Sequence, residues 1–254
     1  MDLELVRQGL ATTRTRAAEL IAAGRVRVDG AVATKPGLDM TGRSLTLVEE
    51  TGGACDFASR GGRKLACALA DLPALETTGR RCLDAGASTG GFTDVLLRNG
   101  AREVVSVDVG HDQLVVELRR HPRVRVLEGC NVRSLTPGDI GGPVELTVAD
   151  LSFISLQLVL PALTSCTQDD GDLLLLVKPQ FEVGRDRLGR GGVVRDRQHR
   201  IDAVDGVGAA AAGLGWGARA IRRSQPPGPS GNVEFFLWLR RDAAALDRDE
   251  LWVR

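Results

Sequence analysis

From residue 59 onward, short apolar runs alternate with segments of helical periodicity, and this alternation constrains the fold more than any other feature of the chain. The pattern favours a largely parallel sheet covered by helices on both faces. The last two runs are separated only by residues 225–232, too few for a helical crossover, so we expect them to pair antiparallel at the sheet edge. Residues 59–254 are therefore predicted to form an α/β domain with a mixed seven-stranded sheet. The strands are predicted over residues 81–84, 103–109, 124–127, 146–149, 173–178, 216–222 and 233–239.

Residues 1–48 have a different pattern, which predicts a small α+β domain. Two short helices are expected within residues 1–23, followed by strands at 25–28 and 44–48 with a turn at Asp29-Gly30. Residues 49–58 contain Gly52 and Gly53, lack periodicity and are interpreted as a linker. Four basic residues can gather on one side of this small domain and are candidate RNA contacts: Arg14, Arg16, Arg25 and Arg27.

Composition narrows the classes of function. The 254 residues carry 33 basic and 33 acidic side chains, so a nucleic-acid binder of this composition needs a local basic patch. The five cysteines form no CxxC pair and the three histidines are scattered, which argues against a metal site or a disulfide framework and fits a reducing cytoplasm. No apolar stretch reaches ten residues and the N-terminus lacks the pattern of a signal peptide, so neither a membrane span nor export is expected.

A glycine-rich turn follows the first predicted strand of the larger domain, over residues 82–93. Its spacing is neither GxGxxG nor that of a phosphate-binding P-loop. Asp84 and Asp108 come at the ends of successive strands, where one carboxylate can meet an amino group and the other can accept two ribose hydroxyls. This suits S-adenosylmethionine, which has an amino-acid end and a ribose. A nicotinamide cofactor and a plain tight turn remain alternatives.

Four charged residues stand beside apolar strands, where an ionised group is costly unless it is paired or does chemistry: Lys64, Asp150, Lys178 and Glu234. Two lysines and two carboxylates suit proton abstraction from a weakly acidic hydroxyl. With the glycine turn, the set indicates methyl transfer onto a ribose. Each residue also has an alternative without a catalytic role: a solvated helix face for Lys64, a strand-end side chain that reaches water for Lys178, a helix N-cap for Asp150 and an exposed edge-strand position for Glu234.

Four long motifs carry a resemblance to a known family: residues 84–93, 149–155, 177–182 and 228–234. In this order they resemble the TlyA (hemolysin A-like) family of ribosomal RNA cytidine 2′-O-methyltransferases, whose Rossmann-like catalytic domain is similar to that of FtsJ/RrmJ. Residues 1–48 resemble the small RNA-binding domain of ribosomal protein S4. The resemblance implies S-adenosylmethionine as cofactor, ribosomal RNA or ribosomal subunits as partner, and a cytoplasmic enzyme.

Carried onto this sequence, the resemblance implies a catalytic tetrad of Lys64, Asp150, Lys178 and Glu234. It also implies the following cofactor contacts: Asp84, Gly86, Ser88, Gly90, Gly91, Asp108 and, near the adenine, Asn131. A methyltransferase acting on a small metabolite is the alternative function, against which the RNA-binding-like domain argues. A membrane-active hemolysin, which the family name suggests, finds no support in the apolar pattern of the chain.

Overall fold

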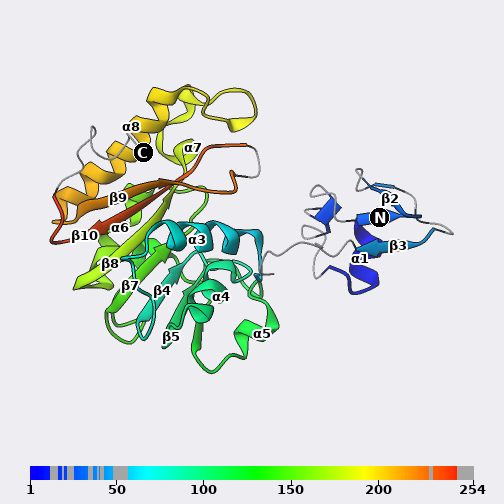
Figure 1. The fold of residues 1–254 in the computed structure, drawn as a ribbon, viewed down its shortest axis with the longest axis horizontal. Helices are drawn as coiled ribbons and strands as arrows, with labels where there is room; N and C mark the ends of the chain where they lie inside the picture. The colour runs from blue at the N-terminus through cyan, green and yellow to red at the C-terminus, as the bar shows by residue number, and fades with distance from the viewer. Residues whose placement is uncertain are drawn as a thin grey trace. The chain divides into compact units, whose positions relative to one another are not determined.

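The computed structural model describes residues 1–11, 17–18, 20–21, 26–33, 37–38, 40, 43–47, 57–228 and 231–244. The chain divides into two compact units, residues 1–55 and 56–254. Figure 1 shows both units as a ribbon coloured along the chain.

The first unit is a small α+β domain in which a helix accompanies a three-stranded antiparallel sheet. Helix α1 spans Asp2–Arg7, and described residues at 17–18 and 20–21 are also helical. The strands are β1 (Val26–Val28), β2 (Ala31–Val32) and β3 (Leu45–Leu47), in the order β2-β1-β3. The turn between β1 and β2 has Asp29 and Gly30 at φ 50° and 82°, as a tight hairpin requires. The short strand β2 was missed by the sequence prediction.

The second unit is an α/β domain built on one seven-stranded sheet, as predicted. Its strands are β4 (Arg81–Ala85), β5 (Glu103–Val107), β6 (Val124–Leu127), β7 (Val144–Ala149), β8 (Thr167–Val177), β9 (Gly217–Arg223) and β10 (Phe235–Arg240). They lie in the order β6-β5-β4-β7-β8-β10-β9. The first five are parallel, whereas β10 runs antiparallel to both β8 and β9. The expected antiparallel pair at the edge is therefore confirmed, with β9 outermost.

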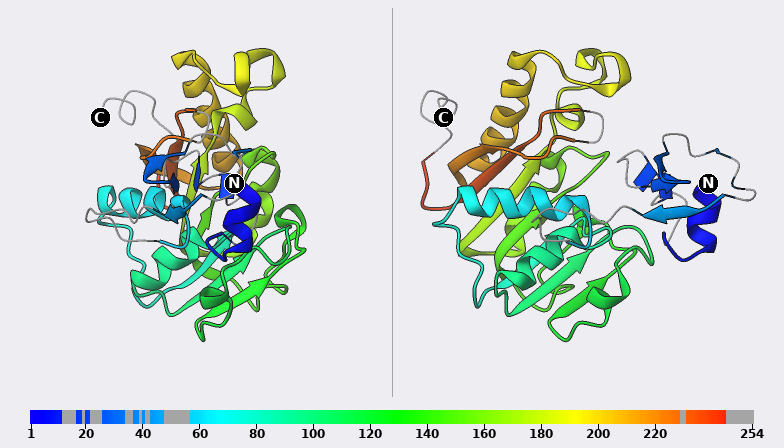
Figure 2. Two further views of the ribbon diagram at one scale, coloured as in Figure 1. Left: turned by 90° about the vertical axis from the view of Figure 1, so that its right-hand side faces the viewer. Right: turned by 45° about the vertical axis from the view of Figure 1, so that its right-hand side comes forward.

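Helices cover both faces of this sheet, as Figures 1 and 2 show. One face packs against α3 (Arg60–Asp71) and α4 (Gly91–Arg98), through buried side chains such as Leu65 and Leu96. The other face packs against α6 (Leu156–Ser165) and α8 (Arg197–Gly213), through Leu160 and Val207 among others. The shorter elements are α5 (Val116–Arg119), α7 (Pro179–Glu182) and the 3-10 turns Val132–Ser134, Arg185–Arg187 and Arg190–Gly192.

The strand order reverses beside β4, because the chain runs outward from β4 through β5 to β6 and then returns to place β7 on the other side. In doubly wound sheets the crevice at such a reversal, outside the carboxyl ends of the strands, is where ligands bind. The backbone N–H of Asp150 donates to the carbonyl of Ala85 over 3.1 Å, so the ends of β7 and β4 are joined at this point.

Candidate active site

The four charged residues singled out in the sequence all belong to elements that meet at one edge of the sheet. Asp150 directly follows β7 and Lys178 directly follows β8. Glu234 directly precedes β10, which is antiparallel to β8, so its start lies beside the end of β8, with Phe235 opposite Val177. Lys64 lies in the first turns of α3. The fold thus brings residues from four separate segments to the same edge.

Lys178 and Asp150 form the first of two ion pairs. The Lys178 Nζ lies 2.6 Å from Asp150 Oδ1 and donates a hydrogen bond of 2.9 Å to Ser152 Oγ. It also lies 5.9 Å from the centre of the Phe181 ring. The Ser152 hydroxyl takes one N–H of the ammonium, and the Asp150 carboxylate pairs with its charge. The amine is therefore held in a fixed direction.

Lys64 and Glu234 form the second pair, and it is more deeply buried. The Lys64 Nζ donates to Glu234 Oε2 over 2.6 Å, and the two side chains are 6% and 1% exposed. Lys64 is therefore not on a solvated helix face, and Glu234 is not an exposed edge residue. Burying an ion pair carries a large desolvation cost, which favours a functional reason for its presence.

The first turn of α3 connects the two pairs. A Cβ at Gly61 would lie 3.6 Å from Asp150 Oδ2, so this turn borders the Asp150 carboxylate. Lys64 is three residues further on and therefore on the same side of the helix. The helix-cap alternative for Asp150 is wrong, because Ser155 is the N-cap of α6 and its hydroxyl accepts from the Gln157 N–H. The four predicted residues thus form two lysine–carboxylate pairs at one edge of the sheet.

Asp84 lies inside β4 and is fully buried. Its Oδ2 accepts a hydrogen bond of 2.7 Å from the Thr93 hydroxyl, which also lies 2.7 Å from Ser106 Oγ. Its Oδ1 is buried and has no hydrogen-bond partner among the described residues. Burial raises the pKa of Asp84 to about 7, and the nearby charges of Asp150 and Asp108 add to the effect. A buried carboxylate with a free oxygen fits a cationic group such as the amino group of an amino acid, directly or through water.

Asp108 follows β5 and is held by the backbone around it. Its Oδ2 accepts from the Ser88 N–H over 2.8 Å, and its Oδ1 accepts from the Gly110 N–H over 2.7 Å. A carboxylate has about four acceptor sites, so two remain for the hydroxyls of a ribose. Asn131 lies nearby along the sheet edge, since the Cys130 N–H donates to the Asp108 carbonyl over 3.0 Å. The Asn131 side chain itself caps the 3-10 turn at Val132–Ser134 by accepting from the Arg133 N–H.

At each of the three glycines of the turn, a side chain would contact other protein atoms. Gly86 and Gly90 have φ of 89° and 99°, and a Cβ there would lie 2.8 Å from the Asp150 carbonyl oxygen and 2.8 Å from Leu114 Cδ1, respectively. A Cβ at Gly91 would lie 2.7 Å from the Gly62 nitrogen, so glycine allows the starts of α3 and α4 to touch. Glycine is therefore required here by conformation and packing, and direct contact with a cofactor remains a prediction for Gly86, Ser88, Gly90 and Gly91.

Two residues within the motifs were not singled out from the sequence, although they hold the site together. Ser152 accepts from Lys178. Glu182, half-buried at the end of α7, accepts from the Ser155 hydroxyl over 2.5 Å and from the Leu156 N–H over 2.8 Å, and burial raises its pKa. These bonds tie the segment after β7 to the segment after β8. The only signal in the sequence was their presence inside the long motifs.

Of the four candidate RNA contacts, Arg27 lies within the described residues. Arg27 is exposed on β1 and donates to the Gly30 carbonyl over 2.7 Å. Arg14, Arg16 and Arg25 lie outside the described residues. Within the described ranges no helix is both long and apolar enough to cross a membrane. Those same ranges contain no group of three or more His, Cys, Asp or Glu residues arranged to hold a metal ion.

Comparison with known proteins gives the family. Residues 57–241 match the model of FtsJ-like methyltransferases, and residues 2–39 match that of the S4 domain. A Mycobacterium tuberculosis protein named 16S/23S rRNA (cytidine-2′-O)-methyltransferase TlyA is 56% identical over 94% of this chain and 89% of its own length. A Bacillus subtilis protein named as an rRNA methyltransferase is 39% identical over 99% of this chain and 89% of its own.

A solved structure also matches nearly the whole chain. It is named as a hemolysin from Streptococcus thermophilus, is 40% identical and has a TM-score of 0.78, covering 98% of this chain and 90% of its own. The fold, the two matched domains and this level of identity lead to one conclusion: the chain belongs to the TlyA family of FtsJ-like methyltransferases and begins with an S4 domain.

Proposed function

We propose that this protein transfers a methyl group from S-adenosylmethionine to the ribose 2′-oxygen of a cytidine in ribosomal RNA, within the ribosomal subunits of the cytoplasm. The observation that carries the proposal is the pair of lysine–carboxylate contacts at the sheet edge, beside the reversal of strand order. The named activity of the Mycobacterium tuberculosis relative supports the choice of cytidine and of ribosomal RNA.

The cofactor would lie over the carboxyl ends of β4, β5 and β6, where its donor groups find complementary acceptors. Asp84, with its unpartnered oxygen, would receive the amino-acid end, and Asp108 would receive the ribose hydroxyls. The turn at Gly86, Ser88, Gly90 and Gly91 would border it, and Asn131 would lie near the adenine. When bound, it supplies a methyl group that is already activated on a sulfonium sulfur.

Lys178 is the proposed proton acceptor. In this proposal the 2′-oxygen would bond to the methyl carbon as the bond from that carbon to the sulfonium sulfur breaks, and the sulfur would leave as a neutral thioether. The hydroxyl proton would go to the amine of Lys178 in its unprotonated form. Asp150, 2.6 Å away, then pairs with the ammonium that forms, and Ser152 keeps the amine pointing at the acceptor. Because the methyl donor is activated, much of the rate would come from holding the hydroxyl in line with it.

Lys64 is proposed to stabilise negative charge on the acceptor oxygen or on a neighbouring phosphate. Glu234 holds the Lys64 side chain in place through the 2.6 Å bond in a nearly water-free setting. In such a setting a fixed cation acts more strongly on nearby charge than it would in water.

The first unit is the proposed RNA anchor. An S4 domain is matched at residues 2–39, which is where Arg14, Arg16, Arg25 and Arg27 lie. None of the proposed catalytic residues lies in this unit. The four arginines are proposed to contact the phosphates of folded RNA, while the second unit performs the chemistry.

A methyl-incorporation assay with labelled S-adenosylmethionine and purified ribosomal subunits tests this function. We expect label in ribosomal RNA with the wild-type protein and none with Lys178→Ala. A wild-type protein that binds the cofactor but labels neither subunit, and labels a small metabolite instead, would show that the second function considered, a metabolite methyltransferase, is the correct one.

A further inference from the structure

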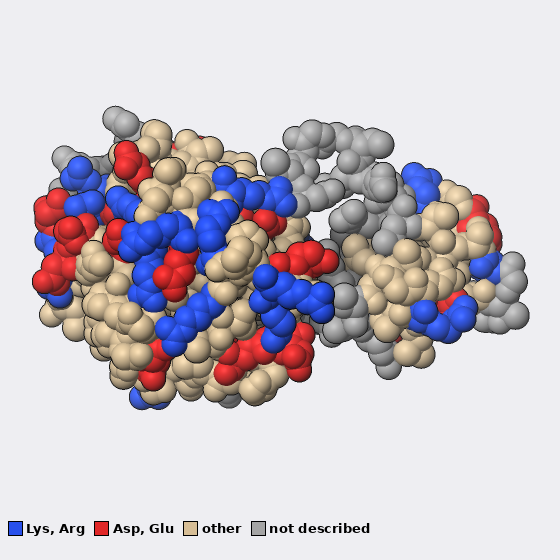
Figure 3. Space-filling view, turned by 90° about the horizontal axis from the view of Figure 1, so that it is seen from below, with Lys and Arg blue, Asp and Glu red and all other residues tan. Residues whose placement is uncertain are grey.

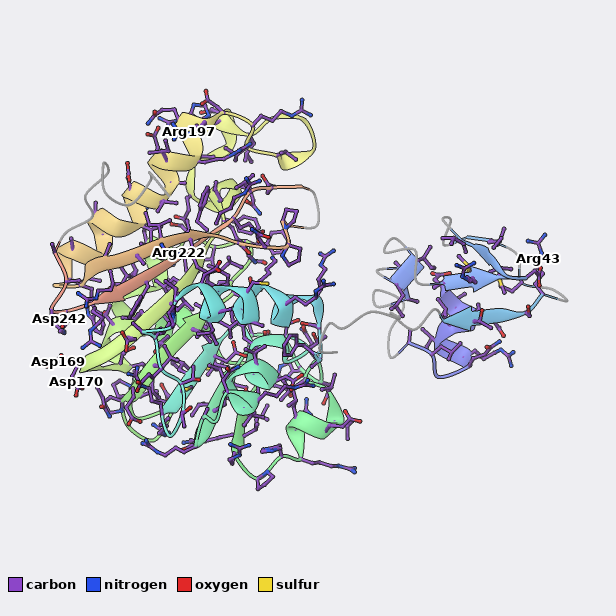
Figure 4. The ribbon with its side chains drawn as sticks, viewed as in Figure 1. Arg43, Asp169, Asp170, Arg197, Arg222 and Asp242 are labelled. Carbon is purple, nitrogen blue, oxygen red and sulfur yellow. The ribbon has the colours of Figure 1, made fainter. Side chains whose placement is uncertain are left out.

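An arginine- and glycine-rich segment follows α7, and the mechanism above does not use it. This segment, residues 184–197, contains five arginines and four glycines against two aspartates. Arg195 and Arg197 are exposed, and Gly191 and Gly192 have φ of 77° and 72°. Figure 4 shows Arg197 at the start of α8.

One buried side chain clamps this segment to the residues that directly precede β10, among them Glu234. Asn232 is 4% exposed and lies two residues before Glu234. Its Oδ1 accepts a hydrogen bond of 2.9 Å from the Val194 N–H, and its Nδ2 donates one of 3.1 Å to the Gly192 carbonyl. The oxygen and the nitrogen of the amide therefore both bond to backbone groups distant in sequence, and the bond to Gly192 spans 40 positions.

A second side chain, that of Arg200, also bonds to the backbone at Val194. The Arg200 guanidinium donates to the Val194 carbonyl over 2.8 Å and to the Arg195 carbonyl over 3.0 Å. Both peptide groups of Val194 are therefore bonded, and the Val194 side chain is 1% exposed. The segment is anchored at Val194, and the exposed arginines next to it start from fixed backbone positions.

The charge of this segment differs from that of other arginine-rich parts of the domain. On the face in Figure 3, basic and acidic side chains lie side by side. Several arginines of the domain are paired with acids, as in Arg102–Glu145, Arg119–Glu128 and Arg98–Asp94. The segment has a basic excess, although its Arg187 pairs with Asp202 of α8 over 3.2 Å. Along the chain it connects α7, which follows Lys178, to the start of α8.

We infer that Asn232 is a positioning residue that clamps residues 184–197 beside the catalytic edge, so that Arg195 and Arg197 meet the phosphates of the acceptor RNA. The inference rests on the proposed function. Arginine suits this role, because its planar guanidinium pairs with phosphate oxygens. Fixing the backbone in advance reduces the entropy lost when RNA binds. If Asn232 served only the stability of the fold, a folded variant that lacks its side-chain amide would bind RNA as well as the wild-type protein.

The test compares Asn232→Ala, the double variant Arg195→Ala/Arg197→Ala, and the triple variant that combines them. Gln198→Ala is the matched control, because the Gln198 side chain bonds to Asp202 within α8 and not to the segment. Calorimetry with S-adenosylmethionine checks that each variant is folded. Limited trypsin digestion with mass spectrometry measures cleavage after the segment's arginines, and steady-state methylation of ribosomal subunits is measured at several salt concentrations.

We expect Asn232→Ala to bind the cofactor normally and to be cut by trypsin within residues 184–197 at least about fivefold faster. Its KM for subunits should rise about tenfold with little change in kcat, as the double-arginine variant's should. The dependence of log affinity for subunits on log salt concentration should become shallower by about 1.4 when the two arginines are removed. The triple variant should be no worse than the double, because the clamp acts through those arginines.

Unchanged KM for subunits in either Asn232→Ala or the double-arginine variant would overturn the inference. If Asn232→Ala fails to bind the cofactor, the double-arginine variant and Asn232→Asp, which keeps the acceptor for the Val194 N–H, decide the question by the same readouts. If the wild-type protein itself does not methylate subunits, the proposed function fails rather than the clamp, whose trypsin result stands independently.

Discussion

The buried pair of Lys64 and Glu234 allows stability and catalysis to be separated in one experiment. Lys64→Met leaves the Glu234 carboxylate at 1% exposure with its cation removed, and Glu234→Leu leaves the Lys64 ammonium equally stranded. Removing one partner of a buried pair costs about 3–5 kcal/mol of unfolding free energy, because the remaining charge is uncompensated. In a domain of this size that lowers the Tm by about 6–20 °C.

The double variant Lys64→Met/Glu234→Leu replaces the pair by apolar side chains of similar volume. Such replacements are neutral or stabilising, so we expect its stability to lie within about 1 kcal/mol of wild type, or above it. Methyl transfer should nevertheless stay lost, because Lys64 is proposed to act on the acceptor. Urea unfolding gives the free energies, and labelled methyl transfer to ribosomal subunits gives the activity.

Asp169→Asn is the matched control, since it breaks an ion pair of 2.8 Å with Arg241 whose side chains are 86% and 43% exposed. An exposed pair contributes less than about 1 kcal/mol, so this change should be nearly neutral. Single variants of Lys64 or Glu234 that lose no more than this control would refute the reasoning about burial. Wild-type activity in the double variant would remove both residues from the catalytic set.

Four other expectations follow from the site and the S4 domain. Lys178→Ala and Lys178→Arg should both lose methyl transfer while calorimetry shows normal cofactor binding, since a guanidinium stays protonated; an active Arg variant would exclude proton abstraction by Lys178. Asp108→Ala should weaken S-adenosylmethionine binding by about 2–4 kcal/mol, and unchanged affinity by calorimetry would place Asp108 outside the cofactor site. The pKa of Asp84 is raised to about 7, so between about pH 4 and 7 the folded state keeps a proton that the unfolded state has lost, and stability falls as the pH rises through this range. Asp84→Asn should therefore have a higher Tm than wild type at pH 8 but not at pH 4. An equal difference in Tm at both pH values would contradict the assignment. Reversing the charge of two of Arg14, Arg16, Arg25 and Arg27 should weaken subunit binding and flatten its salt dependence, with cofactor affinity unchanged; equal binding at all salt concentrations would remove them from the RNA contact.

The sequence predicted the elements of the second unit well where they are apolar and less well where they are not. Strand β6 spans the predicted residues 124–127. Strand β8 begins at Thr167, six residues before its predicted start at 173, because its first half is polar. Asp172 in that half is buried by bonds from Trp238 and Arg80, both more than 60 positions away. Such distant partners leave no local pattern to read.

The candidate site shows the same division. The sequence located Asp150, Lys178 and Glu234 at the ends or starts of apolar strands, where the structure has them. It could not pair Lys64 with Glu234, because these residues are 170 positions apart and meet only through the antiparallel register of β10 with β8. Asn232 was not singled out for the same reason, since its partners lie on a segment without regular periodicity.

The position of the methyl group on the product tests the central claim most directly. Ribosomal RNA from subunits treated with the protein and S-adenosylmethionine is digested to nucleosides and analysed by mass spectrometry. The proposed function predicts a single new product, cytidine methylated on its ribose 2′-oxygen, which is absent after treatment with Lys178→Ala. A methyl group on the base, or a ribose methyl group formed equally well by the Lys178 variant, would contradict it.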